Sequence, residues 1–154
     1  MPQYHGEILS KVDEKGRVLF PAMFRKQISA DTADTFMVKK GYEGCLELYP
    51  IDVWNRLEKE MGKLNHHNKE ARDFRRRFFL GAASVELDKS GRLNIPKRLL
   101  EHAAIEKEMV FYAHSYFIEI WNPERLNSIE SQMTDEQYSD MAQKVMGNIN
   151  LFED

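Results

Sequence analysis

Apolar and polar positions repeat along this chain in two copies of one pattern. Residues 12–21 read Val-Asp-Glu-Lys-Gly-Arg-Val-Leu-Phe-Pro and match residues 87–96, which read Leu-Asp-Lys-Ser-Gly-Arg-Leu-Asn-Ile-Pro, with Asp, Gly, Arg and Pro in register. Further along, Leu-Glu-Leu-Tyr at 46–49 matches Ile-Glu-Ile-Trp at 118–121. Such a repeat constrains the fold more strongly than any single motif does.

The repeat divides the chain into four predicted segments. They are a first repeat at 4–64, a linker helix at 65–80, a second repeat at 81–133 and a C-terminal helical extension at 134–154. The linker carries Ala71, Phe74 and Phe78 at helical spacing. In the extension, Thr134 and Gln137 have the spacing of a capping box, and apolar residues follow at helical intervals.

Each repeat predicts the element order β-β-α-β-β-α. An extended stretch leads to a turn at Gly16 or Gly91, where glycine can take a positive φ, and an apolar strand follows; this predicts a β-hairpin. Pro21 and Pro96 stand where the first helix of each repeat begins. One such unit is too small to bury its own sheet edges and apolar faces, so we expect the two copies to pair in an α+β fold.

Composition indicates a globular protein. The 154 residues are 42% hydrophobic, which is enough for a packed core. No apolar run approaches the roughly 18–20 residues that cross a bilayer, and the first seven residues lack the basic and apolar regions of a signal peptide. We therefore expect a cytoplasmic protein without a membrane partner. The single cysteine, Cys45, cannot form an internal disulfide, and we expect it to be a small buried residue.

Charge is distributed unevenly along the chain. The net charge of −3 at first argues against nucleic-acid binding, which needs clustered Lys and Arg. Residues 11–25, however, hold four basic residues against two acidic ones, and residues 69–77 hold five against two. Residues 124–154 hold seven acidic residues against two basic ones. The chain is therefore polarised rather than uniformly acidic.

Residues that could form an enzyme or metal site are not assembled in the sequence. The five histidines are scattered, and His66 and His67 either point apart on a helix or lie in a loop. There is no glycine-rich phosphate loop, no nucleophile elbow and no recurring pair of acids outside the repeat. We expect no catalysis, no metal and no cofactor.

The most informative motif is a turn of sequence Asp-x-x-Gly-Arg, which occurs once in each repeat. In the first copy, Asp13 can accept hydrogen bonds from the turn backbone, Gly16 permits the reversal, and Arg17 lies within reach of Asp13. Asp88 and Gly91 have the same turn-forming roles in the second copy. The same motif therefore predicts two structurally similar turns.

Two interpretations of the basic residues in these turns remain open. Arg17 and Arg92 can form ion pairs that only hold the turns, and exposed pairs of that kind contribute little to stability. Alternatively, together with Lys11, Lys15 and Lys89 they make a compact basic tip that enters a DNA groove or binds phosphates. Charge alone does not separate the two interpretations.

The paired turns, each followed by an apolar strand, a proline and a helix, resemble the two signature blocks of the MraZ family. The linker sequence Arg-Asp-Phe-Arg-Arg-Arg-Phe-Phe-Leu-Gly-Ala at 72–82 also resembles the linker of that family, and the resemblance extends over residues 6–122. It implies two tandem AbrB-like (SpoVT-AbrB) repeats that form a swapped-hairpin β-barrel with peripheral helices. It also implies that several chains close into a ring.

The resemblance further implies a nucleoid-associated transcriptional regulator. Members of the family bind short repeated sites in double-stranded DNA near the promoter of the division and cell-wall gene cluster, usually including their own gene, and typically repress it. The implied DNA contacts are Lys15, Arg17 and Arg92, with Lys11 and Lys89 on phosphates. Two departures, Ser90 opposite Lys15 and Met23 where the family often has a basic residue, rank the first turn above the second.

The four linker arginines and the overall function each have a second interpretation. The arginines either form a solvated face, paired with Glu70, Asp73 or the acidic tail of a neighbouring subunit, or extend the DNA surface; we favour the solvated face. The alternative function is that of an antitoxin, because AbrB-like barrels also bind partner proteins. Antitoxins of that kind are usually single-repeat chains with a disordered tail, whereas this chain has a doubled repeat and a tail that predicts a helix.

Overall fold

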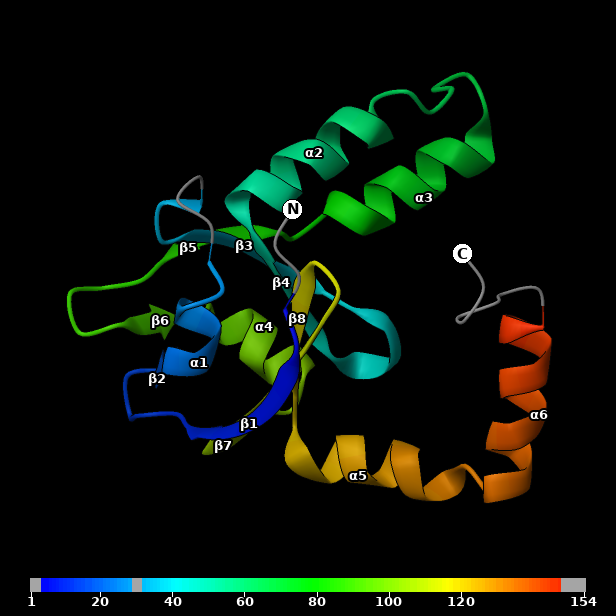
Figure 1. The fold of residues 1–154 in the computed structure, drawn as a ribbon. Coiled ribbons are helices and arrows are strands. Elements are labelled where there is room, and N and C mark those ends of the chain that lie inside the picture. The colour runs from blue at the N-terminus through cyan, green and yellow to red at the C-terminus, as the bar shows by residue number, and fades with distance from the viewer. Residues whose placement is uncertain (1–3, 29–31, 148–154) are drawn as a thin grey trace. The chain divides into compact units, whose positions relative to one another are not determined.

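A computed structural model describes residues 4–28 and 32–147 of the chain (Figure 1). The chain divides into two compact units, Met1–Pro123 and Glu124–Asp154, which we describe separately. The predicted extension at 134–154 is thus described as far as residue 147, and its last seven residues lie outside the described part.

The first unit is built on one large antiparallel sheet and one small one. The large sheet has the strand order β1-β7-β8-β4-β3-β5. Its strands are β1 (Gly6–Lys11), β3 (Thr35–Lys40), β4 (Leu46–Pro50), β5 (Ala83–Glu86), β7 (Glu108–His114) and β8 (Phe117–Trp121). The small sheet, which we call the ribbon, consists of β2 (Arg17–Leu19) paired antiparallel with β6 (Arg92–Asn94).

Strands are exchanged between the two repeats. The first strand of the first repeat, β1, pairs with β7 of the second repeat, and β5 of the second repeat pairs with β3 of the first. At the centre β4 pairs with β8, which again joins one repeat to the other. This exchange confirms the prediction of an α+β fold in which the two repeats form a swapped-hairpin arrangement within one chain.

The simple hairpin predicted within each repeat is wrong in its pairing. The two limbs of the first turn meet in a single bridge between Val12 and Val18, and beyond it β2 pairs with β6 instead of with β1. The physical reason is burial, because Val18 and Leu93 face each other across the ribbon and both are fully buried. Pairing between repeats removes more apolar surface from water than a two-stranded hairpin can.

Two pairs of counterpart residues mark an approximate two-fold axis between the repeats. Val18 pairs with Leu93, which occupies the same position in the second repeat. Glu47 pairs with Glu119 in the same way at the centre of the large sheet. A residue that pairs with its own counterpart lies on the symmetry axis, so the two repeats present their turns symmetrically about it.

Short and long helices complete the first unit. They are α1 (Ala22–Arg25), α2 (Ile51–Met61), α3 (Lys69–Phe79) and α4 (Lys97–His102), with a 3-10 turn, η2, at Tyr42–Gly44. Pro21 and Pro96 are the capping residues directly before α1 and α4, where their restricted φ suits a helix start. The Asn68 side chain accepts a hydrogen bond from the Ala71 backbone N–H and so begins α3 in the linker.

Among the described residues, two apolar clusters hold these elements together. The larger one lies under the sheets and includes Phe20, Phe24 and Phe111, whose rings are 6.0–6.5 Å apart. In the smaller one Trp54 of α2 contacts the rings of Phe78 and Phe79 of α3 at centroid distances of 6.0 and 5.4 Å. The second cluster therefore packs the two longest helices of this unit against each other and against the sheet.

The second unit, as far as the structure describes it, consists of two helices, and the first of them begins at Pro123, directly before the unit. They are α5 (Pro123–Gln132) and α6 (Asp135–Met146). The Thr134 hydroxyl accepts the Gln137 backbone N–H at 3.1 Å, and the Gln137 side chain accepts the Thr134 N–H at 2.9 Å, so the capping box is present. Among residues 4–28 and 32–147, none of the helices has the length and apolar character needed to cross a membrane.

Candidate nucleic-acid interface

The first Asp-x-x-Gly-Arg turn is organised by one carboxylate. The Asp13 carboxylate accepts the backbone N–H groups of Lys15 and Arg17 at 2.9 and 2.8 Å. It also accepts a hydrogen bond from Nε of Arg17 at 2.9 Å, in an ion pair whose side chains are 40% and 35% exposed. Gly16 has a φ of +80°, so the turn needs glycine at this position.

The second turn repeats the backbone geometry but differs in its side chains. The Asp88 carboxylate accepts the backbone N–H groups of Ser90 and Arg92 at 2.8 and 2.9 Å, and Gly91 has a φ of +79°. In the described part of the chain, the Arg92 guanidinium forms no ion pair with Asp88, unlike Arg17 with Asp13. Arg17 therefore forms an ion pair with the aspartate of its turn, whereas Arg92 is bonded to Asp88 through its backbone N–H and acts on that carboxylate by its charge at longer range.

Hydrogen bonds in the turns shift the acidity of both aspartates. The pKa of Asp13 lies below its ordinary value, mainly because the carboxylate accepts the Arg17 backbone N–H. The pKa of Asp88 is lowered in the same way by the Arg92 backbone N–H. Both carboxylates therefore remain charged at neutral pH, and each turn is held in its ionised form.

The ribbon places both turn arginines on one outward face. Side chains alternate along a strand, and Val18 and Leu93 point into the core with no exposure. Arg17 and Arg92 flank these residues and therefore point outward, diagonally across the two strands. The structure brings together on one surface two arginines that lie far apart in the sequence.

The predicted lysines occupy different places relative to this face. Lys15 and Lys89 are exposed at the tips of the first and second turns. Lys11 ends the edge strand β1, opposite Glu108 of β7, so its charge faces an acidic neighbour. The two turn lysines join the ribbon surface, whereas Lys11 lies outside it.

A further basic residue, Arg25, lies at the second turn. Its Nη1 atom is 2.8 Å from the position that a Cβ atom on Gly91 would occupy, so the guanidinium of α1 lies directly against this turn. The counterpart of Arg25 in the second repeat is Leu100, which covers Gly16 of the first turn. Arg25 therefore supplies the second turn with a cation where Ser90 replaces the lysine of the first turn.

Sequence reasoning missed Arg25 because α1 belongs to the first repeat and the turn it covers belongs to the second. The backbone N–H of Phe20 donates to the carbonyl of Gly91 at 2.9 Å and joins the two segments. The only signal in the sequence is a basic residue directly after the buried Phe24 in the helix that follows the ribbon strand. That signal becomes meaningful only when the exchange of strands is known.

A hollow of about 580 Å³ lies beside the first turn. Its lining includes Asp13, Lys15 and Gly16 from the turn and Lys97 from the start of α4. Lys97 is exposed, so the helix of the second repeat adds a cation beside the turn of the first. Each turn is accompanied by a basic residue from the opposite repeat, Lys97 at the first turn and Arg25 at the second.

The linker arginines lie elsewhere on the first unit. Figure 1 shows both turns on one side of this unit and the α2–α3 pair on the other. Asp73 forms ion pairs with Lys69 at 2.6 Å and Arg76 at 3.2 Å, and Arg72 donates to the His66 carbonyl at 2.9 Å. The arginines of α3 are thus a partly paired, exposed helix face that does not continue the surface of the ribbon.

Neither metal chemistry nor thiol chemistry has a site in the described part of the chain. No group of three or more His, Cys, Asp or Glu residues there could hold a metal ion. His66 and His67 lie in the loop between α2 and α3 with their rings 4.1 Å apart, so the expectation that they diverge on a helix is wrong and the loop alternative is right. Burial raises the pKa of the Cys45 thiol to about 12, which keeps it protonated and unreactive.

Comparison with known proteins shows which family this chain resembles. The family described as "MraZ protein, putative antitoxin-like" matches the chain twice, at residues 4–77 and 78–148. The chain is 42% identical over 139 residues to a protein of Christiangramia forsetii named Transcriptional regulator MraZ, covering 90% of this chain and 89% of that one. A protein of the same name from Lactobacillus johnsonii is 41% identical over 140 residues, which cover 91% of this chain and 94% of that one. Another from Flavobacterium psychrophilum is 37% identical over 142 residues, which cover 91% of this chain and 89% of that one.

Proposed function

Because this chain belongs to the MraZ family, whose members are transcriptional regulators and not enzymes, we propose that it regulates transcription by binding double-stranded DNA in a sequence-specific manner. The observation that carries the proposal is the ribbon. It has two Asp-x-x-Gly-Arg turns related by an approximate two-fold axis, with Arg17 and Arg92 on the outward face.

The dimensions of a two-stranded ribbon match those of a DNA groove. The major groove of B-DNA admits a two-stranded β-ribbon, and arginine reads guanine there through two hydrogen bonds to O6 and N7. In the proposed complex Arg17 and Arg92 face base edges from symmetry-related positions. Lys15, Lys89 and Arg25 contact the phosphates on either side, and Lys11 and Lys97 extend this contact at the margin.

Before DNA binds, the guanidinium groups of the two arginines differ in whether they bond to the aspartate of their turn. Arg17 must exchange its bond to Asp13 for a bond to a base, whereas the Arg92 guanidinium has no such bond to Asp88 to give up. With Arg25 beside it, the second turn has three cations, Lys89, Arg92 and Arg25. The first turn also has three, Lys15, Arg17 and the neighbouring Lys97. We therefore propose that the two turns contribute comparably, in place of the ranking that favoured the first.

We further propose that several copies act together as a ring on short repeated sites. The chain has a net charge of −3, so a single ribbon supplies few cations against an acidic background. Several ribbons on one face of a ring would add their phosphate contacts, which explains how an acidic protein binds a polyanion. The resemblance to the family supports the promoter of the division and cell-wall gene cluster as the target, with repression that includes the protein's own gene, at the nucleoid in the cytoplasm.

The test is DNA binding by the full chain and by variants of its ribbon. Fluorescence anisotropy compares the protein's own upstream region with scrambled DNA for wild type, Arg17→Ala, Arg92→Ala and the control Arg56→Ala, an exposed arginine of α2. We expect selective binding by wild type and the control, and a loss of about 1–3 kcal/mol for each ribbon variant. Equal binding of all four proteins, with unchanged mass in light scattering, contradicts the ribbon as the reading surface.

The printed description of the family as antitoxin-like provides the alternative outcome. A regulator that works through a partner protein would co-purify with that protein in stoichiometric amounts and would not select its upstream DNA. Purification of the untreated complex from cells, followed by the same anisotropy measurement, separates the two functions.

A further inference from the structure

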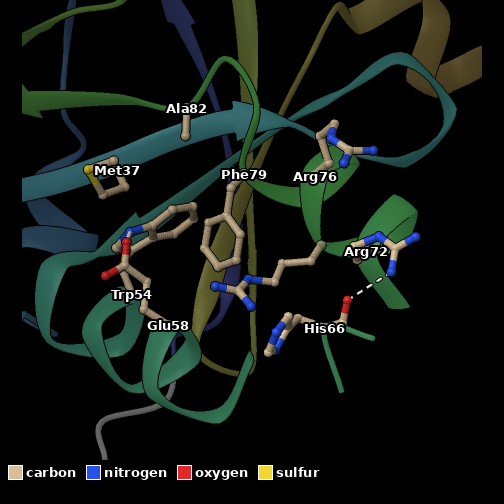
Figure 2. A pocket seen from close by; sticks show the side chains of 9 residues that line it. Met37, Trp54, Glu58, His66, Arg72, Arg76, Phe79 and Ala82 are labelled. Carbon is tan, nitrogen blue, oxygen red and sulfur yellow. Dashed lines mark hydrogen bonds between the residues drawn. The ribbon is translucent and has the colours of Figure 1, made fainter. Parts of the chain in front are cut away.

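A wide hollow in the first unit lies between α2 and α3. This α2–α3 hollow has a volume of about 730 Å³ and is lined by Met37, Trp54, Glu58, His66, Arg72, Arg75, Arg76, Phe79 and Ala82. Figure 2 shows Trp54 and Glu58 on one wall, Arg72 and Arg76 on the other, and Phe79 between them. The hollow therefore combines an apolar floor with a basic rim.

The basic rim results from helical spacing. Arg72, Arg75 and Arg76 lie at i, i+3 and i+4 on α3 and so share one face, with Phe79 at i+7 on the same stripe. Like charges at this spacing repel one another on an isolated helix. A ligand that brings negative charge to this stripe relieves that repulsion.

Acidic groups of the first unit compensate this stripe only in part. Glu58 is the one carboxylate among the lining residues, and it already accepts the Trp54 indole N–H at 2.8 Å. Asp73 is shared between Lys69 and Arg76. Within residues 4–28 and 32–147, Arg75 takes part in no ion pair. The hollow therefore fits a partner with both apolar and acidic groups.

The chain itself contains a short segment of that composition. Residues 151–154 read Leu-Phe-Glu-Asp, two large apolar residues followed at once by two acidic ones. The apolar side chains of this segment can fill the floor while its carboxylates meet the rim, where guanidinium groups bind carboxylates through paired hydrogen bonds. The family match ends at residue 148, so this segment is a feature of this chain beyond the matched region.

We propose that the α2–α3 hollow of one copy binds the segment 151–154 of a second copy. The proposal rests on the ring assembly proposed above. A closed ring needs two different, mutually complementary surfaces on every chain, because a self-complementary surface stops at a dimer. A basic apolar hollow and an acidic apolar segment are such a pair. Because α2 and α3, which line the hollow, lie on the other side of the unit from the turns (Figure 1), the contact leaves the ribbon free for DNA.

The test uses charge reversal in the full chain. One variant, Arg72→Glu with Arg75→Glu, reverses the rim, and a second, Glu153→Lys with Asp154→Lys, reverses the segment. The matched control, Arg56→Glu with Lys59→Glu, reverses two exposed charges of α2 outside the hollow. Light scattering on dilution gives the concentration at which each assembly dissociates. We expect this concentration to rise about tenfold or more for the first two variants and to stay unchanged for the control.

Mixing the two reversed variants shows whether the contact joins different chains. In a mixture, the acidic rim of one variant meets the basic segment of the other, and the remaining wild-type rim meets the remaining wild-type segment. An equimolar mixture that regains the wild-type mass supports the proposal. A mixture that stays dissociated, or reversed variants that assemble like wild type, overturns it.

Two further measurements keep the result decisive. Circular dichroism and thermal unfolding check that each variant is folded, and Arg75→Gln with Glu153→Gln replaces the reversed variants if one of them is not. Anisotropy with upstream DNA is measured on wild type in parallel. If wild type binds DNA but the charge-reversed variants assemble like wild type, the segment contact alone is refuted. If wild type does not bind DNA, the proposed function is refuted.

Discussion

Glu47 of β4 and Glu119 of β8 lie directly opposite each other across the central pair of strands. They are counterparts in the two repeats, so the approximate two-fold axis brings two like charges together in the middle of the sheet. Like charges directly opposite each other on neighbouring strands are destabilising unless other groups compensate them. The neighbours of each glutamate therefore determine whether the fold can hold this symmetric pair of charges.

The two glutamates are compensated by different residues. Glu47 is buried, accepts a hydrogen bond from the Tyr49 hydroxyl at 2.9 Å and pairs with Lys39 Nζ at 3.3 Å. Glu119 lies 2.7 Å from Nε2 of His114 and accepts the Trp121 indole N–H at 2.7 Å. The symmetry of the backbone is thus retained while the side chains on the two sides have diverged.

Loss of Lys39 should destabilise the fold strongly. The ammonium is buried over the Phe78 ring at 4.2 Å, and Lys39→Met leaves the Glu47 carboxylate buried opposite Glu119 without its cation. We expect the free energy of unfolding to fall by about 3–5 kcal/mol, measured by urea denaturation. In the double variant Lys39→Met with Glu47→Gln, much of that loss should be recovered. If the single and double variants are equally unstable, the effect comes from packing and not from charge.

Acid should weaken the turns only at low pH. The pKa values of Asp13 and Asp88 lie below their ordinary range, so ionised carboxylates stabilise the folded turns above about pH 4, and this contribution is lost as pH falls through the folded pKa values. We therefore expect Asp13→Asn with Asp88→Asn to be less stable than wild type at pH 7. The difference in unfolding free energy should shrink toward pH 2. A difference that is constant with pH contradicts the role of the charges.

Arg25 should contribute to the salt dependence of DNA binding. Each phosphate contact adds about 0.9 to the slope of log affinity against log salt concentration, so Arg25→Ala should lower that slope by about this amount. Anisotropy titrations between low and moderate salt measure it. Arg56→Ala, which removes an exposed arginine of α2, serves as the control and should leave the slope unchanged. An unchanged slope for Arg25→Ala excludes the phosphate contact.

The two turn glycines should differ in function more than in stability. Gly16 and Gly91 have φ values of +80° and +79°, so an alanine at either position costs about 1–2 kcal/mol. At Gly91 the new Cβ also meets the Arg25 guanidinium at 2.8 Å, a flexible group that must move, whereas the nearest atoms at Gly16 are 3.8 Å away. We expect similar losses in thermal stability but a larger loss of DNA affinity for Gly91→Ala. Equal losses of affinity would show that Arg25 has no part in binding.

Local patterns in the sequence predict much of this fold. The repeated turns, the helix starts at Pro21 and Pro96 and the capping box at Thr134 depend on neighbouring residues, so short-range spacing is sufficient to find them. The pairing partners of the strands cannot be predicted in this way, because the sequence of an apolar strand such as β2 does not specify which other strand it pairs with. Val18 meets Val12 in one isolated bridge and Leu93 in the ribbon, and only packing of the whole unit decides that the strand pairing continues with β6 and not with β1.

The candidate site shows the same limit. The turn residues Asp13 and Arg17 could be identified from their spacing, and the structure places them within hydrogen-bond distance. The unpaired state of Arg92 relative to Asp88 and the position of Arg25 over Gly91 depend on side-chain geometry between repeats. Contacts of that kind leave no periodic signal in either repeat.

The exchange of strands also constrains how the protein is made. During translation, β1 leaves the ribosome long before β7, its only partner in the described sheet. The pairing of Gly6 with Ala113 cannot form until residue 113 has been synthesised. The ribbon likewise cannot form until Asn94 has been synthesised. A nascent chain therefore exposes unpaired strand edges through most of its synthesis, and a prematurely terminated product that lacks the second repeat has no partner for either strand.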